Sequence, residues 1–300
     1  MKTQIQNEDN QREIDTHLDH VDCDLCGCND TELRYVIQGM NIVQCSCCGL
    51  VYVNPRVPDP NPMNIYDHSY FDYYELTSPA NRITYQKRLE LLERYVPAKG
   101  SILDVGCSIG DFIEIARQRG WSPSGMDVSD AYVDHIRNSL GLPFAVGDFI
   151  EVEYESDSFD VVNMGDSLEH MLAPSKAVEK VFRILKPGGF GYIRVPDIDA
   201  WSPRLMGRRW IQLKPFEHFY YFTRATMTRL LTERGFEILE IGSSGTWCSL
   251  DILRNRFRHY YKSRVMNALL TLLADKLGLG GAKFYLDVRE ELQVIFRKPC

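Results

Sequence analysis

The sequence lacks the features of a membrane-spanning or nucleic-acid-binding protein. None of its apolar runs approaches the length of a membrane span, and its polar N-terminus is unlike a secretory signal peptide. Positive charge is scarce, since 34 Lys and Arg residues face 41 Asp and Glu residues and the net charge is −7. General nucleic-acid binders present a basic face to the phosphates, so we expect no nucleic-acid partner. From the lack of a membrane span and of a signal peptide, we expect a cytoplasmic protein.

The chain also lacks the glycine pattern of a dinucleotide-binding protein. Residues 101–110 read Ser-Ile-Leu-Asp-Val-Gly-Cys-Ser-Ile-Gly, which predicts a buried strand, a tight turn and the start of a helix. Gly106 and Gly110 allow close ligand approach, but Ser108 replaces the second glycine of the GxGxxG fingerprint. Asp104 would repel a pyrophosphate, whereas it can accept hydrogen bonds from a cationic amino-acid group. A cationic nucleoside therefore fits this turn better than NAD.

Apart from Ser108, the run from Asp104 to Gly110 resembles the first motif of class I S-adenosylmethionine (SAM)-dependent methyltransferases, acidic-x-Gly-x-Gly-x-Gly. The resemblance extends over residues 100–242 and implies a Rossmann-like α/β sheet of seven strands, the last one antiparallel. In this family Asp127 would hold the ribose hydroxyls, and Asp148 would meet the adenine amino group. The cofactor-binding residues that the resemblance implies are Asp104, Gly106, Cys107, Ser108, Gly110, Asp127, Val128, Asp148, Phe149 and Met164.

Expected strands and helices alternate along this stretch, which favours a parallel sheet with helices on both faces. Residues 185–190, Leu-Lys-Pro-Gly-Gly-Phe, resemble the turn that precedes the family's fifth strand, and residues 291–297 are expected to form the antiparallel seventh. We expect residues 247–285 to form a helical insertion. Its amphipathic, basic helix over 250–279 can pack on its own domain, on a second subunit or on a membrane surface. We therefore expect a monomer or a homodimer, with peripheral membrane contact as an alternative.

Cysteine is abundant, with nine residues, and its spacing is informative. Residues 23–27 and 45–49 each contain a CxxC pair followed by glycine. Two such pairs can direct four thiolates to one tetrahedral zinc ion, as in zinc ribbons, so we expect a structural metal site rather than disulfides. Cys28 and Cys47 are left over, and either one can compete for a ligand position. The expected zinc ligands are Cys23, Cys26, Cys45 and Cys48.

The predicted segments are a flexible leader at 1–19, a zinc-ribbon-like module at 20–57, a linker with a lid or helical segment at 58–98, and a methyltransferase domain at 99–300. Four prolines between Pro55 and Pro62 mark the linker. A cysteine module ahead of such a domain resembles an arrangement in bacterial methyltransferases that modify sugars and secondary metabolites. Aromatic residues after the prolines either cover the cofactor or pack between the two domains: Tyr66, Tyr70, Phe71, Tyr73 and Tyr74.

Methyl transfer from a sulfonium is an in-line displacement, for which an enzyme aligns the acceptor and removes its proton. Residues 197–222 interrupt the alternation and are expected to cap the substrate. His218 titrates near neutrality and is the expected base, unless it caps the next helix instead, and Glu217 and Glu169 are the next candidates. Residues 166–170, Asp-Ser-Leu-Glu-His, resemble the Glu-x-x-Glu-His run of ubiquinone-pathway O-methyltransferases, where a divalent metal can sit; whether one binds here is open.

The resemblance implies an enzyme that transfers a methyl group from SAM to an oxygen, less readily to a nitrogen or carbon, of a small-molecule acceptor such as a sugar or secondary metabolite. Its cofactors would be SAM and a structural zinc ion. The alternative is a non-catalytic or regulatory SAM-binding protein whose zinc ribbon recognises RNA or protein. An NAD-dependent oxidoreductase is disfavoured by the glycine pattern.

Overall fold

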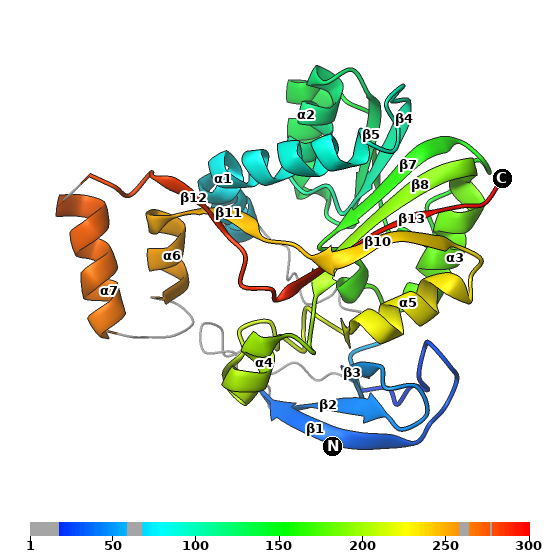
Figure 1. The fold of residues 1–300 in the computed structure, drawn as a ribbon, viewed down its shortest axis with the longest axis horizontal. Helices are drawn as coiled ribbons and strands as arrows, with labels where there is room; N and C mark the ends of the chain where they lie inside the picture. The colour runs from blue at the N-terminus through cyan, green and yellow to red at the C-terminus, as the bar shows by residue number, and fades with distance from the viewer. Residues whose placement is uncertain (1–17, 59–67, 258–263, 277) are drawn as a thin grey trace.

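A computed structural model describes residues 18–58, 68–257, 264–276 and 278–300 (Figure 1). The largest sheet has seven strands: β4 (Ser101–Val105), β5 (Ser122–Asp127), β6 (Phe144–Val146), β7 (Phe159–Gly165), β8 (Leu185–Pro196), β10 (Glu237–Ser243) and β13 (Glu291–Arg297). Their order is β10-β13-β8-β7-β4-β5-β6, and β13 is antiparallel to both of its neighbours, whereas β4 to β8 pair in parallel. The expected α/β sheet with an antiparallel last strand is confirmed.

Helices cover both faces of this sheet, with α1 (His68–Leu92) and α2 (Asp111–Gln118) on one face and α3 (Pro174–Ile184) and α5 (Arg224–Thr232) on the other (Figure 1). The side chains of β4 alternate between the two: Ile102 packs with α1 and α2, and Leu103 and Val105 pack with α3 and α5. The other helical segments are α4 (Trp201–Met206), α6 (Leu250–Arg256), α7 (Arg264–Thr271), η2 (Asp130–Tyr132), η3 (Asp134–Leu140), η4 (Leu168–His170), η5 (Gly207–Arg209) and η7 (Leu272–Lys276).

The N-terminal cysteine module, residues 20–57, is built on a second sheet below α5 in Figure 1. Strands β1 (Thr31–Ile37), β2 (Met40–Cys45) and β3 (Val51–Val53) pair antiparallel, and β9 (Tyr220–Tyr221) adds a fourth strand from the distant segment that precedes α5. The module also contributes Tyr52 to the core beneath α3 and α5. It therefore shares both a sheet and a hydrophobic core with the rest of the chain.

Polar contacts fasten the module to the domain at two further points. Ser175, at the start of α3, donates its backbone N–H to the Asp24 carboxylate at 2.8 Å and its hydroxyl to the Asp24 carbonyl at 2.7 Å. Arg56 donates to the Tyr220 hydroxyl at 2.7 Å and to the Leu172 carbonyl at 2.9 Å. The second contact lies close in sequence to the candidate bases, because Leu172 follows the segment of Glu169 and Tyr220 follows that of Glu217 and His218.

Residues 185–190 lie within the bounds of β8, and the expected turn is found there as a bulge: Phe159 pairs with Leu185 and Val161 with Phe190, so residues 186–189 leave the ladder, and Gly188 has a φ of 76°. One local expectation needs correction. The insertion over 247–285 is not purely helical, because β11 (Thr246–Ser249) and β12 (Lys283–Leu286) form an antiparallel pair at the base of α6 and α7. Their short, partly polar sequences carry no clear strand period.

Two expectations concern residues or side chains that lie outside the described part of the chain. One is the flexible leader, of which residues 1–17 are not described. The other is the role of the aromatic residues after the prolines, which are Tyr66 and the side chains of Tyr70, Phe71, Tyr73 and Tyr74. Within the described ranges, no helix has both the length and the apolar character needed to cross a membrane.

Candidate active site

A cavity of about 1100 Å³ opens at the carboxyl ends of the parallel strands, and one wall is formed by the turns that follow β4 to β8. The opposite wall comes from α1, from residues 211–219 and from the ends of β11 and β13. Most of the residues predicted to act on a ligand line this single cavity: Asp104, Gly106, Cys107, Ser108, Asp127, Val128, Asp148, Phe149, Glu169, Glu217 and His218.

The turn between β4 and α2 takes a tight path past the cavity. Gly106 has a φ of 78°, and a Cβ there would lie 2.9 Å from the Ser167 Cβ, so a side chain is excluded both sterically and conformationally. Ser108 stands at the position where the motif has a second glycine, yet it also adopts a left-handed conformation, with a φ of 48°. Its backbone N–H donates to an Asp127 carboxylate oxygen at 2.9 Å, which holds the serine in this conformation.

Carboxylates from successive strand ends face this end of the cavity. Asp127 accepts hydrogen bonds from the backbone N–H groups of Ser108 and Ser129, and burial raises its pKa in spite of them. Burial raises the pKa of Asp104 to about 7, although the Asn163 amide donates to that carboxylate at 2.5 Å. Asp148, after β6, is exposed at the rim. A cation placed here would offset the cost of burying Asp104 and Asp127.

These residues fit SAM on chemical grounds. The two buried carboxylates suit a ligand with a positive charge and hydroxyl donors, and Gly106 leaves backbone accessible where a nucleoside would pass. Phe149 is buried beside the exposed Val128 and Asp148, so an apolar surface lies next to a polar rim. The donor set therefore matches a cationic nucleoside better than it matches a pyrophosphate.

Two predicted cofactor-binding residues lie elsewhere. Met164, in the interior of β7, is 1% exposed and packs in the hydrophobic core, not against the cavity. Gly110 caps the N-terminus of α2 with a φ of 86°, and Leu140 and Ile136 approach it closely. Met164 was carried over from the family pattern, but its side chain points to the α3 and α5 face of the sheet.

Two buried arginines line the cavity, and the sequence did not reveal either of them as a site residue. Arg88 reaches in from α1, with its guanidinium 3.4 Å from the Asn163 side-chain oxygen and stacked 4.7 Å from the Tyr192 ring centroid. Arg194, in β8, pairs with Asp166 at 2.8 Å. The signal that could have revealed Arg194 is a charged residue inside an otherwise apolar strand. Arg88 carries no comparable signal, because arginine is common in helices.

The other end of the cavity holds a cluster of two histidines and a glutamate, hereafter the Glu–His–His cluster: Glu169, His170 and His218. Glu169 and His170 belong to η4 after β7, while His218 lies just ahead of β9. The Phe219 backbone N–H donates to the Glu169 carbonyl at 2.9 Å, which ties the two segments together. Segments nearly fifty residues apart in the chain thus meet next to β9, the strand that the second segment adds to the small sheet of the cysteine module.

Both imidazoles are held through one ring nitrogen. His170 Nδ1 lies 2.8 Å from the Glu217 carbonyl oxygen, and His218 Nδ1 lies 2.9 Å from the Gln212 carbonyl oxygen. A carbonyl oxygen only accepts, so each Nδ1 carries a proton and each Nε2 carries the lone pair. Burial lowers the pKa of His218 well below its ordinary value, with the charges of His170 and Lys214 adding to the effect, so His218 is neutral near pH 7.

The neighbouring acids differ in their surroundings. Burial raises the pKa of Glu169 well above its ordinary range, and the charge of Asp166 acts in the same direction. Glu217 is paired with Lys214, whose Nζ lies 3.2 Å from its carboxylate. Asp166, which the family pattern grouped with Glu169 and His170, instead pairs with Arg194 and lies outside the Glu–His–His cluster.

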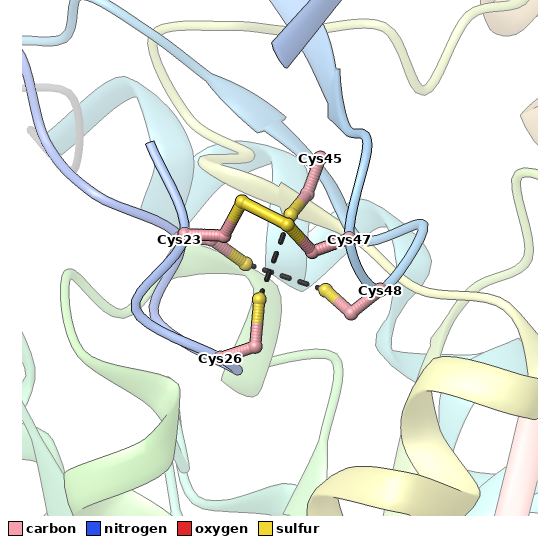
Figure 2. Close-up of a disulfide and its surroundings, with 6 residues drawn as sticks. Cys23, Cys26, Cys45, Cys47 and Cys48 are labelled. Carbon is pink, nitrogen blue, oxygen red and sulfur yellow. Dashed lines mark hydrogen bonds between the residues drawn. A yellow bond between two sulfur atoms is a disulfide. The ribbon is translucent and has the colours of Figure 1, made fainter. Parts of the chain in front are cut away.

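The four predicted zinc ligands converge at one point of the cysteine module (Figure 2). The sulfurs of Cys23 and Cys48 are 3.4 Å apart, and those of Cys26 and Cys45 are 3.6 Å apart. Tetrahedral zinc with Zn–S bonds of about 2.3 Å requires sulfurs roughly 3.8 Å apart, so the cage is close to the required size. Burial raises the pKa of the Cys48 thiol to about 11, a cost that a bound cation would remove.

The remaining cysteines of the module correct one expectation. Cys28 and Cys47 form a disulfide beside the four-sulfur cage, whereas the sequence favoured a metal site in place of disulfides (Figure 2). The two residues belong to the same turns that carry the CxxC pairs, so the turns that bring the four cage sulfurs together also bring Cys28 and Cys47 together. Neither residue then competes for a place in the cage as a free thiol.

Comparison with known proteins agrees with this geometry. A family model described as "Methyltransferase domain" matches residues 78–241, more than half of the chain. A ubiquinone biosynthesis O-methyltransferase of Coxiella burnetii is 28% identical over 108 residues, 34% of this chain and 46% of that protein. A probable S-adenosylmethionine-dependent methyltransferase of Mycolicibacterium smegmatis is 30% identical over 138 residues, 46% of this chain and 52% of that protein.

The chain thus spans about half the length of these two relatives. Among solved structures, a SAM-dependent methyltransferase from Archaeoglobus fulgidus superposes with a TM-score of 0.53 at 18% identity, covering 77% of this chain and 100% of that one, which shows a shared fold. The matched residues contain β4 to β8 and the whole cofactor end of the cavity. The chain belongs to the class I SAM-dependent methyltransferases.

Proposed function

We propose that this enzyme transfers the methyl group of SAM to an oxygen, less readily to a nitrogen or carbon, of a small-molecule acceptor such as a sugar or secondary metabolite. The observation that carries the proposal is one cavity lined at one end by Asp104, Asp127 and Asp148 and at the other by the neutral, buried His218. The aspartates that would bind the cofactor and the histidine that would accept a proton then face the same cavity.

Each cofactor-end residue has a distinct role in the proposal. SAM, when bound, supplies a methyl carbon bonded to a positively charged sulfur. Asp127 accepts hydrogen bonds from the ribose hydroxyls, and Asp104 accepts them from the amino group of the methionine part. Asp148 and Phe149 hold the adenine through its amino group and its ring face. Gly106, Cys107, Ser108 and Val128 form the floor along which the nucleoside lies.

His218 is the proposed base. Its Nδ1 proton is committed to the Gln212 carbonyl, so Nε2 accepts the proton of the acceptor hydroxyl as the oxygen attacks the methyl carbon. Neutrality at pH 7 keeps that nitrogen available. Glu169 and Glu217 are the next candidates, but the paired Glu217 is a weaker base than an unpaired carboxylate.

Two observations support an oxygen acceptor and a sugar-like substrate. The Coxiella burnetii relative is named as an O-methyltransferase. The segment 197–222 contributes polar Gln212 and Lys214 to the His218 end of the cavity beside apolar Ile211 and Phe216, so the acceptor would meet both kinds of group. Such a lining suits a ligand that carries hydroxyls on a partly apolar ring.

The cysteine module is proposed to hold one structural zinc ion through Cys23, Cys26, Cys45 and Cys48. Four thiolates leave no open position at the metal, so the ion stabilises the module and takes no part in the chemistry. The proposed domain limits remain 20–57 for the module, with 58–98 as a connecting segment and 99–300 as the methyltransferase domain. A cytoplasmic monomer or homodimer completes the proposal.

Isothermal titration with SAM and with NAD, followed by mass spectrometry of products from a panel of nucleotide sugars and phenols, tests this function. We expect micromolar SAM binding, and a product heavier by one methylene and methylated on oxygen. Binding of NAD alone would overturn the assignment. SAM binding without turnover of any acceptor would favour the regulatory alternative, and a nitrogen- or carbon-methylated product would refute the choice of oxygen.

A further inference from the structure

The Glu–His–His cluster has the geometry of a metal site. Glu169, His170 and His218 each offer one ligand atom, and these atoms all lie within 4.8 Å of one another. His170 Nε2 is 3.9 Å from a Glu169 carboxylate oxygen, and the two imidazole rings meet edge to face with centroids 4.7 Å apart. Two atoms bonded to one ion at about 2.1 Å lie at most about 4.2 Å apart, so His170 Nε2 and the Glu169 oxygen are within reach of a shared ion.

The cluster is held in place before any ion arrives. Backbone carbonyls of Glu217 and Gln212 accept from the Nδ1 atoms of His170 and His218, and so direct the Nε2 lone pairs to the other side of each ring. Metal-binding histidines in proteins are typically oriented by such a hydrogen bond from the second nitrogen. The hydrogen bond from Phe219 to the Glu169 carbonyl fixes the third member relative to His218.

Glu169 supplies an independent sign that a ligand is missing. Its side chain is 2% exposed, and its Oε2 atom is buried with no hydrogen-bond partner among the described residues. An unpartnered buried carboxylate oxygen is costly, and Arg194 forms its ion pair with Asp166 rather than with Glu169. A cation bound between Glu169 and the two histidines would satisfy that oxygen.

We propose that Glu169, His170 and His218 bind a divalent transition-metal ion such as Zn²⁺, Co²⁺ or Fe²⁺ at the acceptor end of the cavity, separate from the cysteine cage. Two imidazoles and one carboxylate on one side of an ion suit these metals and leave coordination positions open. Here the three side chains line the cavity, so an acceptor in the cavity would have access to an ion that they hold. An acceptor hydroxyl that coordinates there loses its proton to solvent water more readily.

This inference rests on the proposed function and refines one part of it. With an ion bound, His218 Nε2 is a metal ligand and no longer a free base, so the two roles are alternatives for one nitrogen. The ion would also select acceptors that present an oxygen to a metal, such as a hydroxyl next to a second oxygen.

Cobalt titration of the full-length protein, with zinc already in the cysteine cage, tests the site. Cobalt bound by nitrogen and oxygen ligands gives weak visible bands, whereas thiolate ligands give intense charge-transfer bands at shorter wavelength. We expect one further equivalent of Co²⁺ with weak bands only, measured by visible spectroscopy and by elemental analysis. Hydrogen-bond partners of metal ligands alone are worth about 10–100-fold in affinity, so Glu169→Gln and His218→Gln should weaken Co²⁺ binding by at least about 100-fold.

Asp166→Asn is the matched control, because it removes a carboxylate three residues from Glu169 that lies outside the cluster. Its Co²⁺ affinity should stay near that of the wild type. Three results would each overturn the site. The wild type would bind no Co²⁺ beside its zinc, the bound Co²⁺ would show intense thiolate bands, or Glu169→Gln and His218→Gln would both bind Co²⁺ as tightly as the wild type.

SAM titration on the same samples separates the two proposals. If SAM binds and methyl transfer persists with a chelator while no second ion is taken up, the metal site fails and His218 remains the base. If SAM does not bind to the folded protein, the proposed function itself fails. The variants are checked by circular dichroism, so that loss of metal is not mistaken for unfolding.

Discussion

Replacing Arg56 by methionine tests whether the cysteine module holds the catalytic segments in place. Arg56 belongs to the module, and its guanidinium donates to the Tyr220 hydroxyl at 2.7 Å and to the Leu172 carbonyl at 2.9 Å. It also lies 5.5 Å from the centroid of the Tyr220 ring. These contacts reach β9, which follows His218, and the segment that follows His170.

The expected loss of stability follows from the number of contacts removed. Hydrogen bonds from a charged donor contribute about 1.5 kcal/mol each at the low end, and the cation–π contact adds about 0.5 kcal/mol. The Tyr220 hydroxyl still donates to the Leu172 carbonyl at 3.1 Å, so neither partner is left without a hydrogen bond. We therefore expect the free energy of unfolding to fall by about 3.5 kcal/mol, measured by urea denaturation.

Activity should fall for a different reason. A displacement of about 1 Å in an active site can cost about 100-fold in rate, and Arg56→Met loosens the segments that place Glu169 and His218. We expect kcat to fall about tenfold or more while SAM affinity stays within about twofold, because the cofactor end does not touch the module. Arg34→Met is the control, since Arg34 stacks on Tyr35 in β1, away from the cavity. An unchanged kcat in a measurably destabilised Arg56→Met protein would refute the reasoning.

Three further predictions follow from single groups. The pKa of Asp104 is about 7 before SAM binds, and the carboxylate is the form that accepts from an ammonium, so SAM affinity should fall about tenfold per pH unit below 7; a flat titration between pH 5 and 7 would contradict this. His218→Ala should slow single-turnover methyl transfer about 100-fold with SAM affinity unchanged, and full single-turnover activity would exclude both its roles. Cys48→Ser should lose the zinc and lower kcat while SAM still binds, whereas Cys300→Ser, at an exposed cysteine, should keep the metal; zinc retained in Cys48→Ser would disprove the cage.

The fold was predictable because local patterns specify it. Three neighbouring segments show this: the apolar run of β4, the glycine turn after it and the amphipathic α2. The sequence pattern of each segment is enough to predict its conformation. The strand β13 was equally clear, because Glu291 to Val294 alternate between polar and apolar residues, and its antiparallel direction was implied by the family resemblance. The strands β11 and β12 were not predicted, because the formation of a short strand depends more on its pairing partner than on its own sequence.

The site was predictable only in part. Asp104, Asp127 and Asp148 stand at strand ends, and parallel strands bring their ends together, so their meeting could be foreseen. The place of Arg88 in the cavity could not be foreseen, because it depends on how helix α1 packs. The proximity of Glu169 and His218 could not be foreseen either, because His218 is placed by the pairing of β9 with β3.

The cysteine module shows the same limit. The spacing of Cys23, Cys26, Cys45 and Cys48 predicts a cage by itself, because each CxxC pair is a local turn. The Cys28–Cys47 disulfide depends on how the two turns face each other across the cage. Spacing along the chain carries no information on that arrangement, so the sequence left both cysteines without a partner.

The central claim is that carboxylates at successive strand ends hold a cationic nucleoside over the turn after β4, and calorimetry of SAM binding to Asp127→Ala tests it most directly. Asp160→Asn serves as the control, since that carboxylate binds Ser101 at the opposite end of the strands. The account predicts that Asp127→Ala loses about 2 kcal/mol of SAM binding energy, roughly 30-fold in Kd, while the control binds normally. Equal SAM affinity in wild type and Asp127→Ala would contradict it.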